Sequence, residues 1–169
     1  MILSLEDLYQ GSVASRLEIA QRVVNEVGPQ LKTDDGFNCE FALLKQYADD
    51  LNAHMTHMDM GSLCAKCAAT PSGGCCSLYM SNETDALQLA MNMLAGIEVR
   101  FVRDDGEQCC FLGEKGCLFL FKPMFCLNYN CRHIVDAASP EELGQLESLA
   151  GKLLGKQYQV EQYLLGQVG

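Results

Sequence analysis

The sequence predicts a mainly α-helical fold of about four helices, with a cysteine-rich loop and a short β-hairpin-like segment as a minor α+β part. Apolar residues recur at steps of three and four in several stretches, which is typical of amphipathic helices, and alternate at period two in one short stretch, which is typical of a strand. The chain has 169 residues and is 49% hydrophobic, so it can bury a core without the help of disulfides. We therefore expect a single domain over residues 1–169.

The first two helices follow from apolar spacing and from their end signals. Ser15 should begin the first, because Glu18 three residues later would complete a capping box, and Gly28-Pro29 should end it. Its apolar positions are Leu17, Ala20, Val24 and Val27. The second helix has the clearest stripe, formed by Phe37, Phe41, Leu44, Ala48, Leu51, Met55 and Met58. Gly61 should end it, and a loop of small residues that carries the first cysteines should follow.

A third helix and a strand are expected in the middle of the chain. Asn82 can cap the amide of Asp85, and the helix should then run to a stop at Gly96. Residues 97–102 alternate apolar and charged side chains, which favours a short half-buried strand. Residues 110–112 are its candidate hairpin partner.

The last helix has the most complete start signal. Ser139 is a good N-cap, Pro140 suits the first helical position, and Glu142 would close a capping box. The apolar face comprises Leu143, Leu146, Leu149, Ala150, Leu153 and Leu154. Gly151 and Gly155 weaken a helix interior by about 1 kcal/mol each, so we expect close packing of another helix against them.

Charge and hydropathy exclude two classes of partner. The formal net charge is -10, with 12 Lys and Arg against 22 Asp and Glu, which argues against a phosphate-binding surface for nucleic acid. Residues 1–7 show no secretory signal, and the longest later apolar run, 117–121, is far shorter than the roughly 20 residues of a membrane helix. We expect a cytoplasmic protein that binds neither nucleic acid nor membrane.

Ten cysteines are the most informative feature of the chain. Eight fall into two groups: Cys64, Cys67, Cys75 and Cys76, then Cys109, Cys117, Cys126 and Cys131. Cys110 and Cys39 are provisionally set aside. In a reducing compartment, such density favours metal binding or redox activity over a disulfide framework.

The spacing within the groups indicates tetrahedral thiolate ligation. Cys64 and Cys67 are two residues apart, which lets both sulfurs face one metal, as in zinc knuckles and iron–sulfur loops. In the vicinal pairs 75–76 and 109–110, adjacent side chains of an extended backbone point to opposite faces, so at most one of each should face a given metal. Eight thiols suffice for one centre or for two, and both possibilities stay open.

The order of the cysteines resembles that of the zinc- or iron-chelating cysteine-cluster family (YkgJ-like, CxxCxxCC domain). The matching segments are Cys64-x-x-Cys67 with Cys75-Cys76, Cys109-Cys110-Phe111-Leu112, Gly116-Cys117 and Lys122-Pro123-Met124-Phe125-Cys126. They correspond to the family's opening motif and to its Cys-x-Phe-Leu, Gly-x-Cys and Arg-Pro-x-x-Cys elements, over about residues 64–131. The chain departs from the pattern in the seven residues between Cys67 and Cys75, in Lys122 at the arginine position, and in Leu127. The resemblance implies a metal-binding region at 64–131.

All-sulfur ligation favours zinc or an iron–sulfur cluster over magnesium, calcium or copper(II). We favour iron–sulfur slightly, because cysteines are in surplus and four phenylalanines, Phe111, Phe119, Phe121 and Phe125, could form a dry shell. The centre would serve structure, electron transfer or metal handling. A thiol–disulfide redox protein that uses Cys64 and Cys67 is an alternative. Another is a metal-dependent enzyme, which the family's lysine-methylase relatives make conceivable.

Other candidate ligands have simpler explanations. Asp50, His54 and His57 share one face of the second helix, where a solvated surface is preferred over a second metal site. His133 could replace a sulfur near Cys131. Met55, Met58, Met60, Met91 and Met93 could capture a soft metal, although helical spacing favours core packing for Met55 and Met58. Cys39 should be buried and inert.

Overall fold

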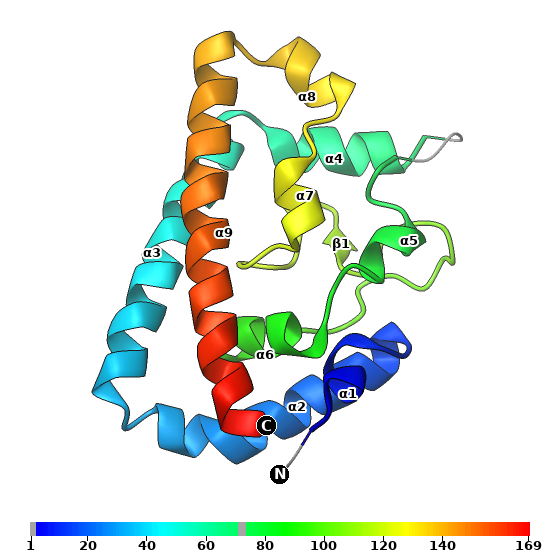
Figure 1. Ribbon diagram of the computed structural model, residues 1–169. Helices are drawn as coiled ribbons and strands as arrows, with labels where there is room; N and C mark the ends of the chain where they lie inside the picture. Colours follow the sequence, from blue (N-terminus) through cyan, green and yellow to red (C-terminus); the bar gives the residue numbers. More distant parts are fainter. Residues whose placement is uncertain (1–2, 71–73) are drawn as a thin grey trace.

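A computed structural model describes residues 3–70 and 74–169 of the chain and is mainly helical (Figure 1). Within these residues it contains nine helices and one two-stranded antiparallel sheet, so the expected count of about four helices is too low. The helices are α1 Leu5–Tyr9, α2 Val13–Leu31, α3 Asp35–His57, α4 Met60–Ala68, α5 Leu78–Ser81, α6 Ala86–Leu94, α7 Met124–Asn128, α8 Arg132–Ala137 and α9 Pro140–Val168. The strands are β1 Leu112–Gly113 and β2 Gly116–Cys117. The additional helices are short, with no more than nine residues each, and lack a long apolar stripe.

The longest helices form the frame of the molecule. The helices α3 and α9 pack side by side, while α2 packs against α6 and crosses the lower end of this pair (Figure 1). The short elements that carry the cysteines, from α4 to α8, lie together to one side of α9. No helix in the described part of the chain is long and apolar enough to span a membrane.

The start of α9 confirms the predicted capping box. The predicted close packing against the glycines of this helix is wrong. The Ser139 hydroxyl accepts a hydrogen bond from the Glu142 backbone at 3.2 Å, and the Glu142 carboxylate accepts one from the Ser139 backbone at 2.7 Å. This capping box ties down the first turn. Gly151 and Gly155 are exposed, and a Cβ on either would meet nothing within 4 Å. Close helix packing is therefore not the reason for these glycines.

Both predicted ends of α2 are wrong. Ser12, not Ser15, is the N-cap, and its hydroxyl accepts a hydrogen bond from the Ser15 backbone at 3.1 Å. The helix also continues through Gly28-Pro29 to Leu31. Proline in the last turn removes one backbone donor but keeps a helical φ, and burial of Val27 and Leu31 against the core favours the extra turn.

The second helix ends earlier than predicted, and Gly61 does not end it. The helix α3 stops at His57, and Asp59, with φ of 53°, makes a left-handed turn into α4. Gly61 lies inside α4, so Cys64 and Cys67 are helical instead of belonging to a loop. The helix α4 has only nine residues, so its apolar spacing covers fewer than three turns and is easily taken for part of a loop.

The third helix begins later than predicted, and the expected strand is absent from the described residues. Asp85 caps α6 by accepting a hydrogen bond from the Gln88 backbone at 2.8 Å, and the predicted stop at Gly96 is confirmed by its φ of 88°. Residues 97–102 form no strand. Their link to residues 110–112 is the hydrogen bond from Val102 N to Cys110 O. The hairpin lies instead in β1 and β2, with Leu112 opposite Cys117.

Three buried amide side chains fasten the segment before α7 to the helical frame. Asn92 donates to Phe121 O at 2.9 Å and accepts from Phe121 N at 3.0 Å. Gln88 also donates to Phe121 O, and Gln157 of α9 donates to Lys122 O at 3.1 Å. Because buried backbone groups need partners, these bonds fix the path of the chain between β2 and α7.

Candidate metal centre

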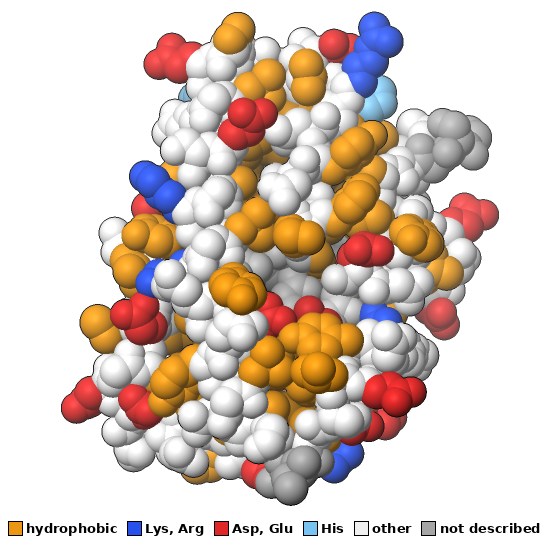
Figure 2. Space-filling model, viewed as in Figure 1, with side chains coloured by type: hydrophobic (Ala, Val, Ile, Leu, Met, Phe, Trp, Pro, Cys, Tyr) orange, Lys and Arg blue, Asp and Glu red, His pale blue; other side chains and the backbone are white. Residues whose placement is uncertain are grey.

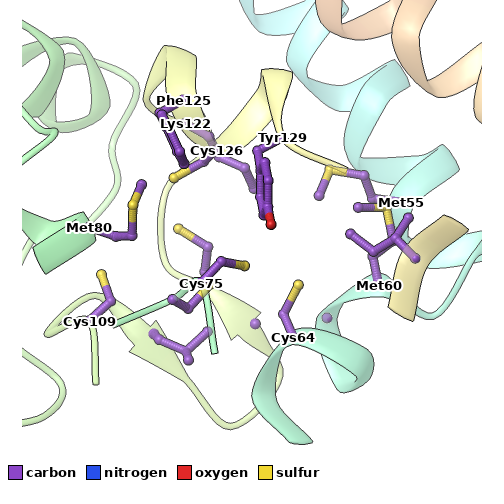
Figure 3. A pocket seen from close by; sticks show the side chains of 16 residues that line it. Met55, Met60, Cys64, Cys75, Met80, Cys109, Lys122, Phe125, Cys126 and Tyr129 are labelled. Carbon is purple, nitrogen blue, oxygen red and sulfur yellow. The ribbon is translucent and has the colours of Figure 1, made fainter. Parts of the chain in front are cut away.

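The eight cysteines expected to bind metal come from six neighbouring segments. Cys64 and Cys67 lie on α4, Cys75 and Cys76 follow α4, Cys109 precedes β1, Cys117 ends β2, Cys126 lies on α7, and Cys131 is the N-cap of α8. Figure 3 shows the labelled side chains of Cys64, Cys75, Cys109 and Cys126 around a common space. The fold therefore gathers thiols that are up to 67 positions apart, counting from 64 to 131.

Contact between two glycines brings α4 against the hairpin. A Cβ on Gly61 would lie 2.4 Å from Lys115 O, and one on Gly116 would lie 3.0 Å from Gly61 Cα. Gly116 also has φ of 110°, which suits glycine. Since Cys64 lies about one turn after Gly61 and Cys117 directly follows Gly116, this contact turns both cysteines toward the same cavity.

A second close approach and a run of hydrogen bonds join the two cysteine groups. A Cβ on Gly74 would lie 2.9 Å from Cys67 Sγ, so the backbone that leads to Cys75 lies directly on α4. The Cys109 amide donates to Cys76 O at 2.9 Å, which places the first group beside the second. No local pattern predicts this pairing, because it depends on a hydrogen bond over 33 positions, from 76 to 109.

The cysteines line two cavities that are joined only in the sense that three cysteines line both. The larger, of about 90 Å³, is lined by six of them: Cys64, Cys75, Cys76, Cys109, Cys117 and Cys126. The smaller, of about 10 Å³, is lined by five: Cys64, Cys67, Cys75, Cys76 and Cys131. Three cysteines, 64, 75 and 76, belong to both. The two cavities together include all eight of the expected cysteines, and we call them the thiol site.

The two cysteines set aside lie elsewhere. Cys110 lines neither cavity, and burial raises the pKa of its thiol. Cys39 lies on α3 and is exposed, so the expectation that it is buried is wrong. All ten cysteines are free of disulfides.

Thiol hydrogen bonds shift the pKa values of the shared cysteines. A hydrogen bond with Cys76 holds the pKa of the Cys64 and Cys75 thiols below the ordinary value, to about 6 for Cys75. The same bonds raise the pKa of Cys76, and burial adds to the rise. Burial, followed by repulsion from neighbouring thiolates, raises the pKa of Cys109 to about 11 and that of Cys126 to about 12. A cation is needed before all of these thiols can ionise together.

Lys122 supplies one positive charge at the larger cavity. It is the one cationic residue among the described residues that line it. Its ammonium group is buried and donates to Asn52 Oδ1 at 2.6 Å and to Phe119 O at 3.2 Å. Burial lowers the pKa of Lys122, while the nearby thiolates oppose this effect. One ammonium cannot balance several thiolates, so the site has capacity for further positive charge.

The donor set fits a soft or borderline metal, but the thiols are not yet arranged around one. No three His, Cys, Asp or Glu side chains in residues 3–70 and 74–169 stand where they could hold a metal ion. The larger cavity has sulfur ligands within an apolar shell that includes Met55, Met60, Met80 and Leu112. Thiolate sulfur suits zinc and iron–sulfur clusters, and an apolar shell limits solvent access to such centres. Binding would therefore require the cysteine side chains to rotate within a backbone that already brings them together.

One histidine lines the thiol site, and the other two lie between α3 and the start of α9. His133 lines the smaller cavity with its five cysteines. His54 is buried, with Nε2 2.9 Å from Glu142 O at the start of α9, so the preferred solvated surface is wrong for this residue. His57 Nε2 lies 3.7 Å from Glu142 Oε1, and Asp50 is exposed. These contacts attach α3 to α9.

Sequence reasoning missed two side chains of the shell, those of Met80 and Tyr129. Met80 lines the larger cavity, and Tyr129 extends into it (Figure 3). Met60, which was a candidate soft-metal ligand, lines this cavity too. Met55 lines the same cavity while also packing on the core, and Met91 and Met93 are core residues. For Met80 and Tyr129 no local pattern existed, because their position depends on how α5 and α7 fold over the cysteines.

Comparison of the chain with models of known protein families, with curated proteins and with solved structures finds no match. The resemblance to the cysteine-cluster family therefore stays a prediction, and the geometry of the thiol site carries the functional argument.

Proposed function

We propose that this protein binds a metal centre, an iron–sulfur cluster or zinc, through the eight cysteines of the thiol site. One observation carries the proposal: these eight cysteines line two joined cavities, whereas Cys39 and Cys110 line neither. Free thiols gathered from six segments favour a bound metal, since ligation would offset the cost of bringing several thiolates together. The proposal assumes the cytoplasmic location expected from the sequence, where thiols stay reduced.

The shell of the larger cavity favours an iron–sulfur cluster over zinc. Structural zinc and an iron–sulfur cluster each need four cysteine ligands, so the six cysteines of this cavity suffice for either, and the preference for a cluster rests on the apolar shell. A cluster would supply one-electron transfer, whereas zinc would stabilise the fold. The buried Met60 and Met80 would keep water from part of the centre, and Lys122 would offset part of the negative charge. Electron transfer, structure and metal handling are all compatible with this site.

The shared cysteines favour one connected site over two remote ones. Cys64, Cys75 and Cys76 line both cavities, so a second metal would lie beside the first. Thiol–disulfide exchange between Cys64 and Cys67 is the weaker alternative, because Cys67 lines only the smaller cavity, whereas Cys64 lines both cavities together with Cys75 and Cys76. No further observation favours a methylase-like activity.

Paired serine variants test the proposal. The protein is purified without oxygen, and its bound iron, zinc and sulfide are measured for the wild type, Cys76→Ser, Cys126→Ser, Cys110→Ser and Cys39→Ser. We expect Cys76→Ser and Cys126→Ser to lose at least half of the bound metal, and Cys110→Ser and Cys39→Ser to keep it. Cys75 and Cys76 both line both cavities, so Cys75→Ser shows whether one or both members of this vicinal pair hold the metal. Equal metal content in all variants would refute the assignment.

A further inference from the structure

Three methionine side chains, those of Met55, Met60 and Met80, line the larger cavity of the thiol site together with its six cysteines. Core packing accounts for two of them, because Met60 belongs to the main hydrophobic core and Met55 packs against it. Met80 is only 8% exposed, yet in the described part of the chain it belongs neither to this core nor to the side chains packed against it. Core packing therefore does not explain why a methionine is buried at this position.

The path of the chain holds Met80 beside the cysteines. The Leu78 amide, at the start of α5, donates to Glu107 O at 2.8 Å, so this helix is fastened to the segment that leads to Cys109. Leu78 itself is exposed, whereas Met80 is buried and lines the cavity. Figure 3 shows the Met80 side chain between those of Cys109 and Cys126, at the edge of the common space. Its thioether is therefore available to an ion that those two thiols bind.

The lining of the larger cavity offers sulfur donors almost alone. Six cysteines and three methionines line it, and among the described lining residues there is no carboxylate and no histidine. Zinc takes thiolate, imidazole or carboxylate ligands, and iron–sulfur clusters take thiolates, with imidazole in some cases. A thioether is a neutral, soft donor, and copper(I) accepts both thiolate and thioether sulfur. Met80 thus offers a ligand that suits copper(I) and that zinc and iron–sulfur clusters do not use.

We propose that the thiol site also binds copper(I), with Met80 Sδ as a ligand beside the thiolates of Cys109 and Cys126. The assignment rests on the proposed function, metal binding by the thiol site, and adds a further ion and a ligand that is not a cysteine. Copper(I) accepts fewer ligands than the four of structural zinc, so two thiolates and one thioether suffice. The reducing compartment expected from the sequence keeps thiols free, and copper(I) is the form of copper under such conditions.

The charges around the cavity favour a neutral sulfur ligand. Two thiolates and a thioether on copper(I) leave one negative charge, which the ammonium group of Lys122 at this cavity would balance. Four thiolates on zinc leave two negative charges, of which the same ammonium would balance one. The outer side of α7 adds no charge, because Met124, Phe125 and Tyr129 are exposed there, and Figure 2 shows mainly hydrophobic side chains over this region. An unbalanced charge is costly in such surroundings, so a thioether suits the cavity better than a further thiolate.

X-ray absorption at the copper edge tests directly whether a methionine binds the ion. The full-length chain is produced with selenomethionine, kept reduced without oxygen, and loaded with copper(I) supplied as its acetonitrile complex. We expect selenium among the atoms bound to copper in the wild type and in Met91→Leu, a buried core position outside the cavity. Met80→Leu should lose this selenium signal. Copper bound to sulfur alone in the wild type, or selenium that persists in a folded Met80→Leu, would overturn the proposal.

Competition with the chelator bathocuproine disulfonate measures the strength of copper(I) binding, and circular dichroism checks the fold of each variant. Leucine keeps the size and apolar character of methionine but has no sulfur. The copper(I) affinity of Met80→Leu should therefore fall by about tenfold or more relative to its zinc affinity, because even a group that only orients a ligand contributes about 10–100-fold. A parallel change in both affinities would assign Met80 to the apolar shell alone and refute the proposal.

The wild type separates this inference from the proposed function. Protein that contains iron and sulfide or zinc when purified, but binds no copper(I), would refute the copper site and leave the proposed function intact. Protein that binds none of these metals would refute both.

Discussion

Gly61 of α4 and Gly116 of the hairpin are in backbone contact, and this contact brings Cys64 and Cys117 to one cavity. A Cβ on Gly116 would lie 3.0 Å from Gly61 Cα, and a Cβ on Gly61 would lie 2.4 Å from Lys115 O. The obstacle is backbone in both cases, so it cannot move aside as a flexible side chain would. The thiol site therefore depends on two residues that have no side chain.

Gly61→Ala should separate α4 from the hairpin. Overpacking of this kind costs about 1–3 kcal/mol, so we expect the free energy of unfolding to fall by about 2 kcal/mol, together with loss of bound metal. Urea denaturation and metal analysis measure the two effects. Gly151→Ala is the control, because its Cβ meets nothing within 4 Å and alanine should stabilise α9 by about 0.5–1 kcal/mol. Equal stability of the two variants would contradict the role of the glycine contact.

Asn92→Leu should destabilise the segment that leads to α7. The buried Asn92 amide bonds both Phe121 N and Phe121 O, so leucine leaves a backbone donor without a partner. An unsatisfied buried group costs about 1–3 kcal/mol, and we expect a loss of about 3 kcal/mol with the second bond included. Asn25→Ala, at an exposed position of α2, should change stability by less than about 0.5 kcal/mol. A loss below 1 kcal/mol for Asn92→Leu would show that these bonds do not anchor the segment.

Asp85→Asn should stabilise the protein at neutral pH but not in acid. Burial raises the pKa of Asp85 from 3.8 to about 6, so the native state holds its proton more tightly than the unfolded chain does. In the wild type, the protonated Asp85 carboxyl contributes its full stabilisation below about pH 3.8, and this contribution is lost as the pH rises through 6. Asparagine still caps the helix and carries no charge. At about 1.4 kcal/mol for each pKa unit, the variant should be up to about 3 kcal/mol more stable than the wild type at pH 7.5.

Measuring the free energy of unfolding of Asp85→Asn and of the wild type across pH checks the direction in which the pKa of Asp85 is shifted. The difference in the free energy of unfolding should decrease from pH 7.5 to pH 4 and approach zero near pH 4. Other titrating groups cancel in this difference because both proteins share them. A difference that grows in acid would mean that Asp85 is stabilised as the carboxylate.

Metal removal should loosen the cysteine region and leave the helical frame intact. The thiols need to rotate to hold a metal, whereas α3 and α9 pack on each other without any cysteine of the thiol site. We expect hydrogen exchange after metal removal to quicken in α4 and in residues 109–131 and to stay slow in α3, α6 and α9. Uniform loss of protection would show that the metal supports the whole fold.

The sequence predicted the frame better than the site. Ser139 with Glu142 gave a strong local signal for α9, and the apolar stripe indicated the position of α3 although not its end, because caps and apolar spacing act within a few residues. The roles of the glycines were reversed. Gly61 was expected to end a helix and packs inside one, while Gly151 was expected to pack and is open. A glycine's role depends on what approaches it, which a single sequence does not contain.

The composition of the thiol site was also predictable, but its construction was not. Order and spacing singled out the eight cysteines that line the joined cavities. The hydrogen bond from Cys109 to Cys76 and the position of Lys122 are long-range contacts without a local pattern. For the same reason the sequence could not decide between one site and two.

The metal content and absorption spectrum of protein purified without oxygen test the central claim most directly. A bound iron–sulfur cluster would give iron and sulfide in equal amounts and visible absorption that bleaches on reduction; zinc would give a colourless protein with about one or two zinc ions per chain. Either result supports a metal centre in the thiol site. A well-folded, colourless protein that contains no metal and has ten free thiols would contradict it.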